Sequence, residues 1–511
     1  MTLRRGLISG ARHRDFEAVE ANAMRAAAGL RGIGVGPGDA VALLLRNDFV
    51  FFEASFAAQA AGIYAVPINW HLAPAEVGYI LEDSEAKVLV VHADLLAHVQ
   101  ERIPEGVTVL VEPTPPEIFD AYGIDAADVS PPDGAALWSD WLEGFEPLAK
   151  PYPQKAETMM YTSGTTGLPK GVRRAMQTPE QAVAMAAMRD MVYGVRPGIR
   201  ALVAGPLYHA APNSFGLRAA RVADAVVLMP RFDAKQFLDI VAAERVTTTF
   251  MVPTMFVRLL KLADEVRAAA DASSLEYIMH AAAPCPSEVK RRVIEWFGPI
   301  VHEFYGGTEG GYWTLCNSEE WQAKPGTVGR PPVGVILKAL DDDGNEVPAG
   351  TPGQLYGRLT TFPDFTYNKR AEARRQIERD GLITIGDVGY FDADGYVFIC
   401  DRAKDMVVSG GANIYPAEIE AELVHMRGVA DGAVFGIPDP EYGEKLMAVV
   451  QPQPGAELSA EAVMEYLRRH IAGFKVPRVI EFRDALPRGD DGKIIKRRLR
   501  DPYWQGHERN V

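Results

Sequence analysis

The N-terminal part of the chain alternates between segments with helical periodicity and short, continuous apolar runs. The helical segments are residues 17–30, 51–62 and 75–84, and the apolar runs are residues 40–45, 64–69 and 87–93. Apolar runs of this length are typical of buried strands, and strands that alternate with helices form parallel sheets. The pattern therefore predicts an α/β fold. Residues 104–153 are rich in Pro, Asp and Glu, and we expect them to form a long irregular surface connection.

The pattern changes along the second half of the chain. Residues 326–399 contain short β-like segments separated by turn sequences such as DDDGNEVPAG and DADG. After residue 401, the amphipathic helical segments 417–424 and 459–471 alternate with apolar strands. We predict a large N-terminal domain, residues 1–400, of α/β sheets plus a β-rich subdomain. We predict that a small α+β C-terminal domain, residues 401–511, follows it.

Composition and charge narrow the classes of partner. The 511 residues are 48% hydrophobic and 24% charged, which is typical of a globular protein with a large core. The net charge of −15 argues against nucleic acid as the main partner. Three widely spaced cysteines without a CxxC pair indicate a reducing compartment. We expect a cytoplasmic protein without a membrane span. Transient contact with a membrane is compatible with this sequence, and the oligomeric state is not specified by it.

The segment with the strongest chemical signal is residues 161–172, YTSGTTGLPKGV. It follows an apparent strand and places hydroxyl groups and glycines around Lys170. Glycines let backbone N–H groups approach an anion, and a lysine adds positive charge. The segment is not a Walker A loop, because Lys170 is followed by Gly171 rather than by Ser or Thr.

This segment resembles the phosphate-binding loop of the adenylate-forming superfamily, which includes acyl-CoA synthetases, firefly luciferases and peptide-synthetase adenylation domains. Other segments resemble further motifs of that superfamily in the expected order. They are residues 206–212 (PLYHAAP), 280–284 (HAAAP), 305–309 (YGGTE), 385–389 (IGDVG), 401–405 (DRAKD), 409–416 (SGGANIYP) and 492–497 (GKIIKR). The resemblance covers essentially the whole chain.

The resemblance implies an ATP-binding site and a set of catalytic residues. Their side chains suit the activation of a carboxylate by ATP. The implied ATP-binding residues are Thr162, Ser163, Gly164, Thr165, Thr166, Gly167, Lys170, Ala282, Ala283, Pro284, Tyr305, Asp387 and Arg402. The implied catalytic residues are Thr308, Glu309 and Lys493, with Glu309 also the ligand of Mg²⁺. Activation of a carboxylate by ATP brings two anions together, so the site must neutralise charge. Read from the sequence alone, Lys493 is one more basic residue in a basic segment.

The resemblance also implies a hinge and a site for coenzyme A. Asp401 is the expected hinge residue, about which the C-terminal domain rotates between adenylation and thioester formation. The expected CoA-binding residues are Ser409, Gly410, Gly411 and Lys475. The implied co-substrates are ATP and CoA, with Mg²⁺ as the metal.

The acid is expected to be hydrophobic. Amino-acid-activating relatives carry an Asp just after the segment that matches PLYHAAP, whereas this chain has Asn213-Ser-Phe-Gly-Leu217. A buried, unpaired ammonium group would be costly, so an amino acid is disfavoured. The expected acyl pocket is mostly apolar or aromatic: Tyr208, His209, Phe215, Met251, Val252, Met255, Phe256, Gly311 and Trp313. Gly311 is expected to leave room for a bulky acyl group, such as a fatty, aryl or sterol-side-chain acid.

The predicted function is therefore an ATP-dependent acyl-CoA synthetase. Two alternatives stay open at this point: an adenylating enzyme that loads a separate carrier protein, and a non-catalytic nucleotide-binding homologue.

Overall fold

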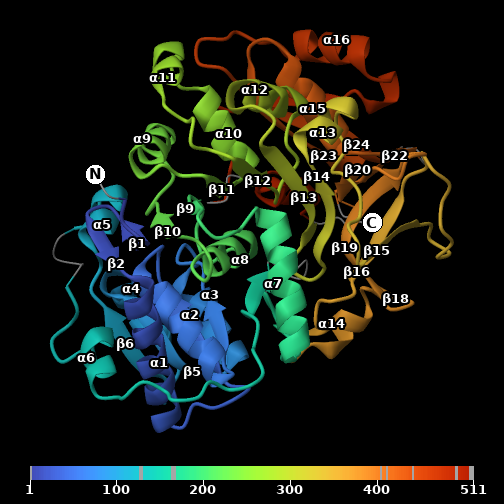
Figure 1. Ribbon diagram of the computed structural model, residues 1–511. Coiled ribbons are helices and arrows are strands. Elements are labelled where there is room, and N and C mark those ends of the chain that lie inside the picture. Colours follow the sequence, from blue (N-terminus) through green and yellow to red (C-terminus); the bar gives the residue numbers. More distant parts are fainter. Residues whose placement is uncertain are drawn as a thin grey trace.

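The structure is a computed structural model that describes residues 3–125, 130–162, 169–402, 405–409, 412–439, 442–489 and 493–505. In Figure 1 the N-terminal elements lie at the lower left, the β-rich elements β15 to β20 at the right, and helices α15 and α16 at the top. The predicted fold class, a mixed α/β protein with a large N-terminal and a small C-terminal part, is confirmed.

An eight-stranded sheet forms the largest layer of the N-terminal part. Its order is β14 (Gly311–Cys316), β13 (Val301–Gly307), β12 (Tyr277–His280), β11 (Thr248–Met251), β9 (Arg200–Val203), β10 (Ala225–Leu228), β1 (Gly6–Ser9) and β2 (Arg12–Arg14). The pairings from β13 to β1 are parallel, and the outer pairs β13–β14 and β1–β2 are antiparallel.

A four-stranded parallel sheet faces the same core. Its order is β4 (Tyr64–Pro67), β3 (Ala40–Leu44), β5 (Ala86–His92) and β6 (Thr108–Glu112). One hydrophobic cluster joins inward-facing side chains of both sheets to helix α2 (Phe49–Ala61), which is buried along almost its whole length. The sequence of α2 is apolar all round rather than amphipathic, as is typical of a helix that is buried on all sides.

Antiparallel sheets follow. A small one contains β17 (Phe365–Tyr367), β8 (Lys170–Arg174) and β7 (Met160–Thr162). The β-rich unit contains β15 (Val335–Leu340), β16 (Gly353–Leu359), β19 (Leu382–Phe391), β18 (Glu378–Arg379) and β20 (Val397–Arg402). It occupies the part of the chain in which the turn sequences predicted short strands.

The C-terminal part has its own sheet. This sheet contains β22 (Ala412–Ile414), β21 (Val407–Ser409), β24 (Gly443–Pro452), β23 (Val429–Asp439) and β25 (Val479–Phe482). Strand β20 still pairs with β19, so the chain passes from one sheet to the next between residues 402 and 407. The predicted domain boundary at residue 400 lies just before this passage and stays a prediction.

The helices cover the sheets. They are α1 (Phe16–Gly32), α3 (Pro74–Ser84), α4 (Ala93–Val99), α5 (Pro116–Tyr122), α6 (Trp138–Glu143), α7 (Pro179–Tyr193), α8 (Ala210–Ala219), α9 (Ala234–Glu244), α10 (Pro253–Leu260), α11 (Asp264–Ala269), α12 (Ser287–Phe297), α13 (Ser318–Ala323), α14 (Ala371–Arg375), α15 (Pro416–His425), α16 (Ala460–His470) and α17 (Lys496–Arg500). Within the described parts of the chain, every helix is too short or too polar to traverse a lipid bilayer.

The expectation for residues 104–153 is wrong in part. This stretch contains helices α5 and α6 and strand β6, whose Leu110 and Val111 are buried in the four-stranded sheet. The prolines around β6 obscure a strand that is stabilised by pairing with β5 rather than by its own composition. The strands β1 and β2 were also not expected, because β1 pairs with β10, which lies more than 200 residues away in the sequence.

Buried charges connect β2 to α2 and β6. Arg12 Nη2 contacts Asp48 Oδ1 at 2.6 Å, and Arg14 is paired with Glu53, a fully buried residue. Burial, together with the negative charges of Asp48 and Glu53, raises the pKa of Glu112 at the end of β6 to about 8. Glu112 therefore retains a proton in the folded state at pH values where the unfolded chain releases it, so its contribution to stability falls as the pH rises from about 4.5 to about 8.

We expect Glu112→Gln to remove this loss. The variant should unfold at a higher temperature than the parent protein at pH 8.5, and the difference should shrink at pH 5.5. Thermal unfolding at both pH values measures it, with Glu105→Gln as the control, since Glu105 is an exposed side chain before the same strand. A difference that does not change with pH would show that the ionisation of Glu112 is not linked to folding.

Candidate functional site

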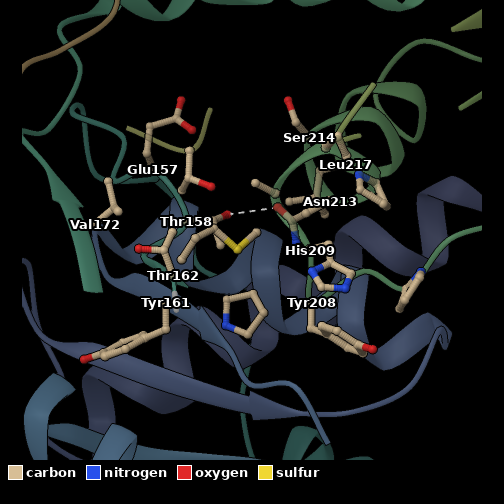
Figure 2. A pocket seen from close by; sticks show the side chains of 18 of the residues that line it. Glu157, Thr158, Tyr161, Thr162, Val172, Tyr208, His209, Asn213, Ser214 and Leu217 are labelled. Carbon is tan, nitrogen blue, oxygen red and sulfur yellow. Dashed lines mark hydrogen bonds between the residues drawn. The ribbon is translucent and has the colours of Figure 1, made fainter. Parts of the chain in front are cut away.

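One cavity of about 1490 Å³ lies among the two N-terminal sheets, the β13–β14 turn and the segment around Lys493. Figure 2 shows part of its wall, with Tyr161 and Thr162 on one side and Tyr208 and His209 facing them on the other. Ten residues of the predicted site line it: Thr162, Lys170, Tyr208, His209, Val252, Met255, Ala282, Thr308, Glu309 and Gly311. Lys493 lines it as well and reaches it from the C-terminal part of the chain.

The segment predicted to hold phosphates lies in a β-hairpin on the cavity wall. Thr162 at the end of β7 is opposite Lys170 at the start of β8. The Lys170 ammonium lies 5.2 Å from the centre of the Tyr367 ring. Both ends of the turn therefore carry a cation or a hydroxyl donor into the cavity. Five predicted residues of this turn lie outside the described residues: Ser163, Gly164, Thr165, Thr166 and Gly167.

The turn between β13 and β14 presents Thr308 and Glu309. Glu309 Oε1 accepts hydrogen bonds from Thr162 Oγ1 at 3.2 Å and from the Tyr367 hydroxyl at 3.0 Å. The strands approach so closely that a Cβ on Gly306 would overlap the carbonyl oxygen of Gly311. A glycine is required there for the turn to form.

The donor set around Glu309 fits a magnesium ion. Mg²⁺ keeps several waters and is bound through one or two carboxylates together with substrate phosphates, so it needs no protein cage. Among the described residues no cluster of three or more His, Cys, Asp or Glu side chains could hold a metal. The Glu309 carboxylate, which lies within hydrogen-bond distance of the Thr162 hydroxyl, provides the hard oxygen ligands that such an ion prefers.

Arg174 fixes this turn and was not identified from the sequence. Its Nη2 donates to the carbonyl oxygens of Thr308 and Glu309, both at 2.6 Å. Its Nη1 donates to the carbonyl of Pro363 at 3.0 Å, and its guanidinium lies 3.5 Å from the centre of the Phe362 ring. Burial lowers the pKa of Arg174 to about 10, so the side chain still carries a positive charge at neutral pH.

The residues predicted to hold the nucleoside meet at the β19–β20 pair. The Tyr305 hydroxyl donates to Asp387 Oδ2 at 2.8 Å, and the backbone of Asp387 is opposite that of Arg402. Ala282, on the cavity wall, has a φ of 78°, a left-handed conformation that is uncommon for alanine. Four other residues predicted to bind ATP are described by the structure but do not line the cavity: Ala283, Pro284, Tyr305 and Asp387.

Lys493 is hydrogen-bonded through its backbone to Gly489. Gly489 also lines the cavity, and its backbone N–H donates to the Lys493 carbonyl at 2.8 Å. The neighbouring Lys496 is paired with Glu420 of α15 at 2.8 Å, which ties this segment to the core of the C-terminal part. Lys493 therefore lines the cavity from a segment that the Lys496–Glu420 ion pair holds against α15.

Asp401 joins the two parts of the chain. Its backbone is opposite Val388 of β19, and its Oδ2 accepts from the Ala417 N–H at the start of α15 at 2.8 Å. Of the predicted CoA residues, Ser409 ends β21, and the Lys475 ammonium is paired with Glu418 at 2.7 Å. Gly410 and Gly411 lie outside the described residues.

Four residues of the predicted acyl pocket lie in the packed core and not on the cavity wall. They are Phe215, Met251, Phe256 and Trp313. Successive side chains of a strand point to opposite faces of the sheet. In β14, Tyr312 lines the cavity and Trp313 is therefore directed to the other side. The sequence placed these residues close to the site, but it did not fix the direction of their side chains.

Gly311 lines the cavity, but its role differs from the one expected. Its φ is +75°, a conformation that strains any other residue. A Cβ built there would lie 2.8 Å from Phe362 Cδ1 and 3.3 Å from Leu359 Cδ2. The glycine is therefore required by the backbone and by the neighbouring ring, and not only by the volume of an acyl group.

Polar residues also line the cavity, although the acyl pocket was predicted to be mostly apolar or aromatic. Glu157 Oε2 accepts from Arg189 Nη2 at 2.7 Å, and Arg189 Nε donates to Ser214 Oγ at 3.1 Å. Figure 2 shows Glu157 and Ser214 near the same end of the view, above the dashed hydrogen bond between Thr158 and Asn213. Burial opposes the charge of Arg189, but Glu157 together with Tyr312 and Tyr193 raises the pKa of Arg189 above its ordinary value. The one available signal was an arginine within the Met- and Ala-rich sequence of α7.

A family model described as AMP-binding enzyme matches residues 4–360, and the model of the AMP-binding enzyme C-terminal domain matches residues 418–493. A feruloyl-CoA synthase of Amycolatopsis sp is 36% identical over 93% of this chain and 91% of its own length. The fatty acid–[acyl-carrier-protein] ligase ScoC of Streptomyces coeruleorubidus is 32% identical over 97% of this chain and 93% of its own length. The crystal structure of ATP-bound MatB from Rhodopseudomonas palustris superimposes with a TM-score of 0.83 and 27% identity, and covers 99% of this chain and 97% of its own.

We expect Gly311→Ala to destabilise the protein. The left-handed conformation alone costs a non-glycine residue about 1–2 kcal/mol, and the contact with Phe362 adds to it. Gly395→Ala is the matched control, because Gly395 has a φ of +81° and no described atom lies within 4 Å of a Cβ built there. Thermal unfolding should show a larger decrease for Gly311→Ala. Equal decreases would mean that Phe362 yields without cost.

Proposed function

Since the chain belongs to the AMP-binding enzyme family, we propose that it is an ATP-dependent acyl-CoA synthetase for a hydrophobic carboxylic acid. The acid first reacts with ATP to give an acyl-adenylate and pyrophosphate, and the acyl group then passes to CoA with release of AMP. The observation that carries the proposal is that Lys170, the adjacent pair Thr308 and Glu309, and Lys493, which come from three distant segments, line the same cavity.

The first half-reaction requires charge neutralisation. A carboxylate oxygen of the acid attacks the α-phosphorus of ATP, and the bond from that phosphorus to pyrophosphate breaks. Lys170 and Thr162 lie together where they can hold the leaving phosphates, and Thr308 and Lys493 can donate to the α-phosphate and the attacking oxygen. Donors that are fixed in advance stabilise the charge that develops in the transition state. Glu309, with the Thr162 hydroxyl nearby, would hold Mg²⁺, which when bound would add neutralisation of the phosphate oxygens.

The nucleoside is oriented by the pair of Tyr305 and Asp387. A carboxylate can accept from both hydroxyl groups of a ribose. Because Tyr305 already donates to one carboxylate oxygen, the orientation of Asp387 is fixed before the nucleotide binds. The backbone of Ala282, strained at a φ of 78°, forms the wall against which the base would lie.

The second half-reaction uses the passage between the two parts of the chain. The CoA thiol attacks the acyl carbonyl carbon, and the bond from that carbon to the AMP oxygen breaks. The segment 409–411, which we propose as the path of the pantetheine arm, follows directly after the β20–β21 passage at which Asp401 lies. Lys475 could reach the CoA phosphates only by leaving Glu418.

The acid is proposed to be aryl or aliphatic and uncharged apart from its carboxylate. The relatives include enzymes named for feruloyl-CoA and for fatty acids. Aromatic side chains line the cavity: Tyr193, Tyr208, Phe250, Phe304, Tyr312 and Phe362. Glu157 does not provide a site for a substrate ammonium group, because Arg189 neutralises it.

We also propose a cytoplasmic location, which Cys285, Cys316 and Cys400 support, since all three are free thiols.

Transfer to a carrier protein is the second candidate, because the relative ScoC is named as an acyl-carrier-protein ligase. A panel of carboxylic acids with ATP, Mg²⁺ and CoA, analysed by mass spectrometry of the products, tests the first candidate. Acyl-adenylate without any thioester would favour the carrier protein, and no pyrophosphate with any acid would contradict an enzymatic role.

We expect Lys493→Ala to slow adenylation by about 10²-fold or more, since a donor to the developing charge is removed. Thioester formation from a pre-made acyl-adenylate should be retained, because that step is proposed to occur with the C-terminal part turned away. Pyrophosphate release and thioester formation are measured separately. Arg497→Ala is the control, because Arg497 belongs to the same basic segment but its side chain is 64% exposed and forms an ion pair with Asp501. Equal losses in both half-reactions would contradict the role of Lys493.

A further inference from the structure

A directional chain of hydrogen bonds crosses the wall of the cavity. Arg189 Nε donates to Ser214 Oγ at 3.1 Å, and Ser214 Oγ lies 2.8 Å from the Tyr312 hydroxyl. The Tyr312 hydroxyl donates to that of Tyr193 at 3.3 Å, which in turn donates to the Ala211 carbonyl at 3.2 Å. Since the Tyr312 proton is directed to Tyr193, Ser214 donates to Tyr312. Each hydroxyl proton of the chain is therefore engaged within the protein.

The guanidinium of Arg189 is the part of this chain that has donors left for a ligand. Arginine carries five N–H groups. Within the described residues, the hydrogen bonds to Ser214 and Glu157 engage Nε and Nη2. The Arg189 side chain lines the cavity and is 19% exposed, and that of Glu157 is 16% exposed. Arg189 therefore has N–H groups that no hydrogen bond within the described residues engages, on a residue that lines the cavity in which the acyl group is proposed to lie.

The hydrogen-bond donors of this wall favour a ligand oxygen that accepts hydrogen bonds. Glu157 balances the charge of Arg189, and the Glu309 carboxylate balances that of the nearby Arg174, whose guanidinium donates to the backbone carbonyls of Thr308, Glu309 and Pro363. The four side chains together are neutral, and the wall offers a ligand the remaining N–H groups of Arg189. A purely hydrocarbon group would displace water from Arg189 without replacing its hydrogen bonds, and such unpaired polar groups are costly.

We infer that Arg189 determines substrate specificity by donating a hydrogen bond to an oxygen substituent on an aromatic acid, at a position remote from its carboxylate. This inference rests on the proposed function. The ring of such an acid can pack against the aromatic side chains Phe250, Phe304, Tyr312 and Phe362 of the same cavity. Glu157 is a positioning residue, since its ion pair fixes the guanidinium.

The test compares three phenylpropenoic acids that carry a hydroxyl, a methoxyl or a methyl group at ring position 4. The methyl group has nearly the size of the hydroxyl but accepts no hydrogen bond. At saturating ATP and CoA, we expect kcat/KM for the hydroxyl and methoxyl acids to exceed that for the methyl acid by about 10- to 100-fold, as expected for a hydrogen bond from a charged donor. The methoxyl acid matters because it accepts but does not donate, so its preference identifies Arg189 rather than Glu157.

The double variant Glu157→Gln/Arg189→Gln removes both charges together and leaves no buried ion unpaired. We expect the preference to fall to within about 3-fold, with kcat/KM for the methyl acid retained. The matched control is Asp190→Asn/Arg218→Gln, which removes a neighbouring ion pair between α7 and α8 and should keep the preference. Arg189→Lys, which retains the ion pair but not the planar set of donors, provides a second variant and should reduce the preference in part.

Each outcome decides between the alternatives. Thioester formation from all three acids at similar kcat/KM would overturn the inference and leave the proposed function intact. A preference for the hydroxyl acid alone would assign recognition to Glu157 and would also overturn it. No adenylate or thioester from these three acids would overturn the inference, while the proposed function is decided separately by pyrophosphate release with the wider panel of carboxylic acids. Thermal unfolding of each variant separates a loss of recognition from a loss of fold.

Discussion

The hydrogen bonds of Arg174 hold the site together. From strand β8, which also begins with Lys170, this one side chain donates to the backbone of the turn that carries Thr308 and Glu309. The segment proposed to hold phosphates and the turn proposed to hold the metal are therefore joined by a charged group and not only by packing. Charge-assisted hydrogen bonds are stronger than neutral ones and are hard to replace once their donor is buried. The geometry of Glu309 with Thr162 and Tyr367 depends on this connection.

Much of the fold could be predicted from the sequence, because the information is local. The periodicity of residues 17–30 became helix α1, and the apolar runs at residues 40–45 and 87–93 became the parallel strands β3 and β5. Strands β6 and β1 were missed because their stability comes from neighbours that are distant in the sequence. Local composition carries no record of such pairings.

The candidate site shows the same division. The motif residues Lys170, Glu309 and Lys493 could be identified individually, and the structure brings them to one cavity. Met251 and Phe256 were predicted to line the acyl pocket together with their sequence neighbours Val252 and Met255. Adjacent residues of a strand or a helix point in different directions, however, and these two side chains face the core. Arg174 and Arg189 could not be found, because their partners come from segments that only the fold brings together.

The side chain of Asp401 crosses the passage between the two parts of the chain. Its backbone belongs to strand β20 of the N-terminal part, while its carboxylate accepts from the first turn of helix α15. If α15 turns relative to β20 about the intervening residues, the distance between Asp401 and the Ala417 N–H must change. A charge-assisted bond of this kind has a narrow range of favourable distances, so it opposes small rotations and is lost in large ones. If the C-terminal part rotates, we therefore expect this contact to favour the one orientation in which it forms over a continuous range of orientations.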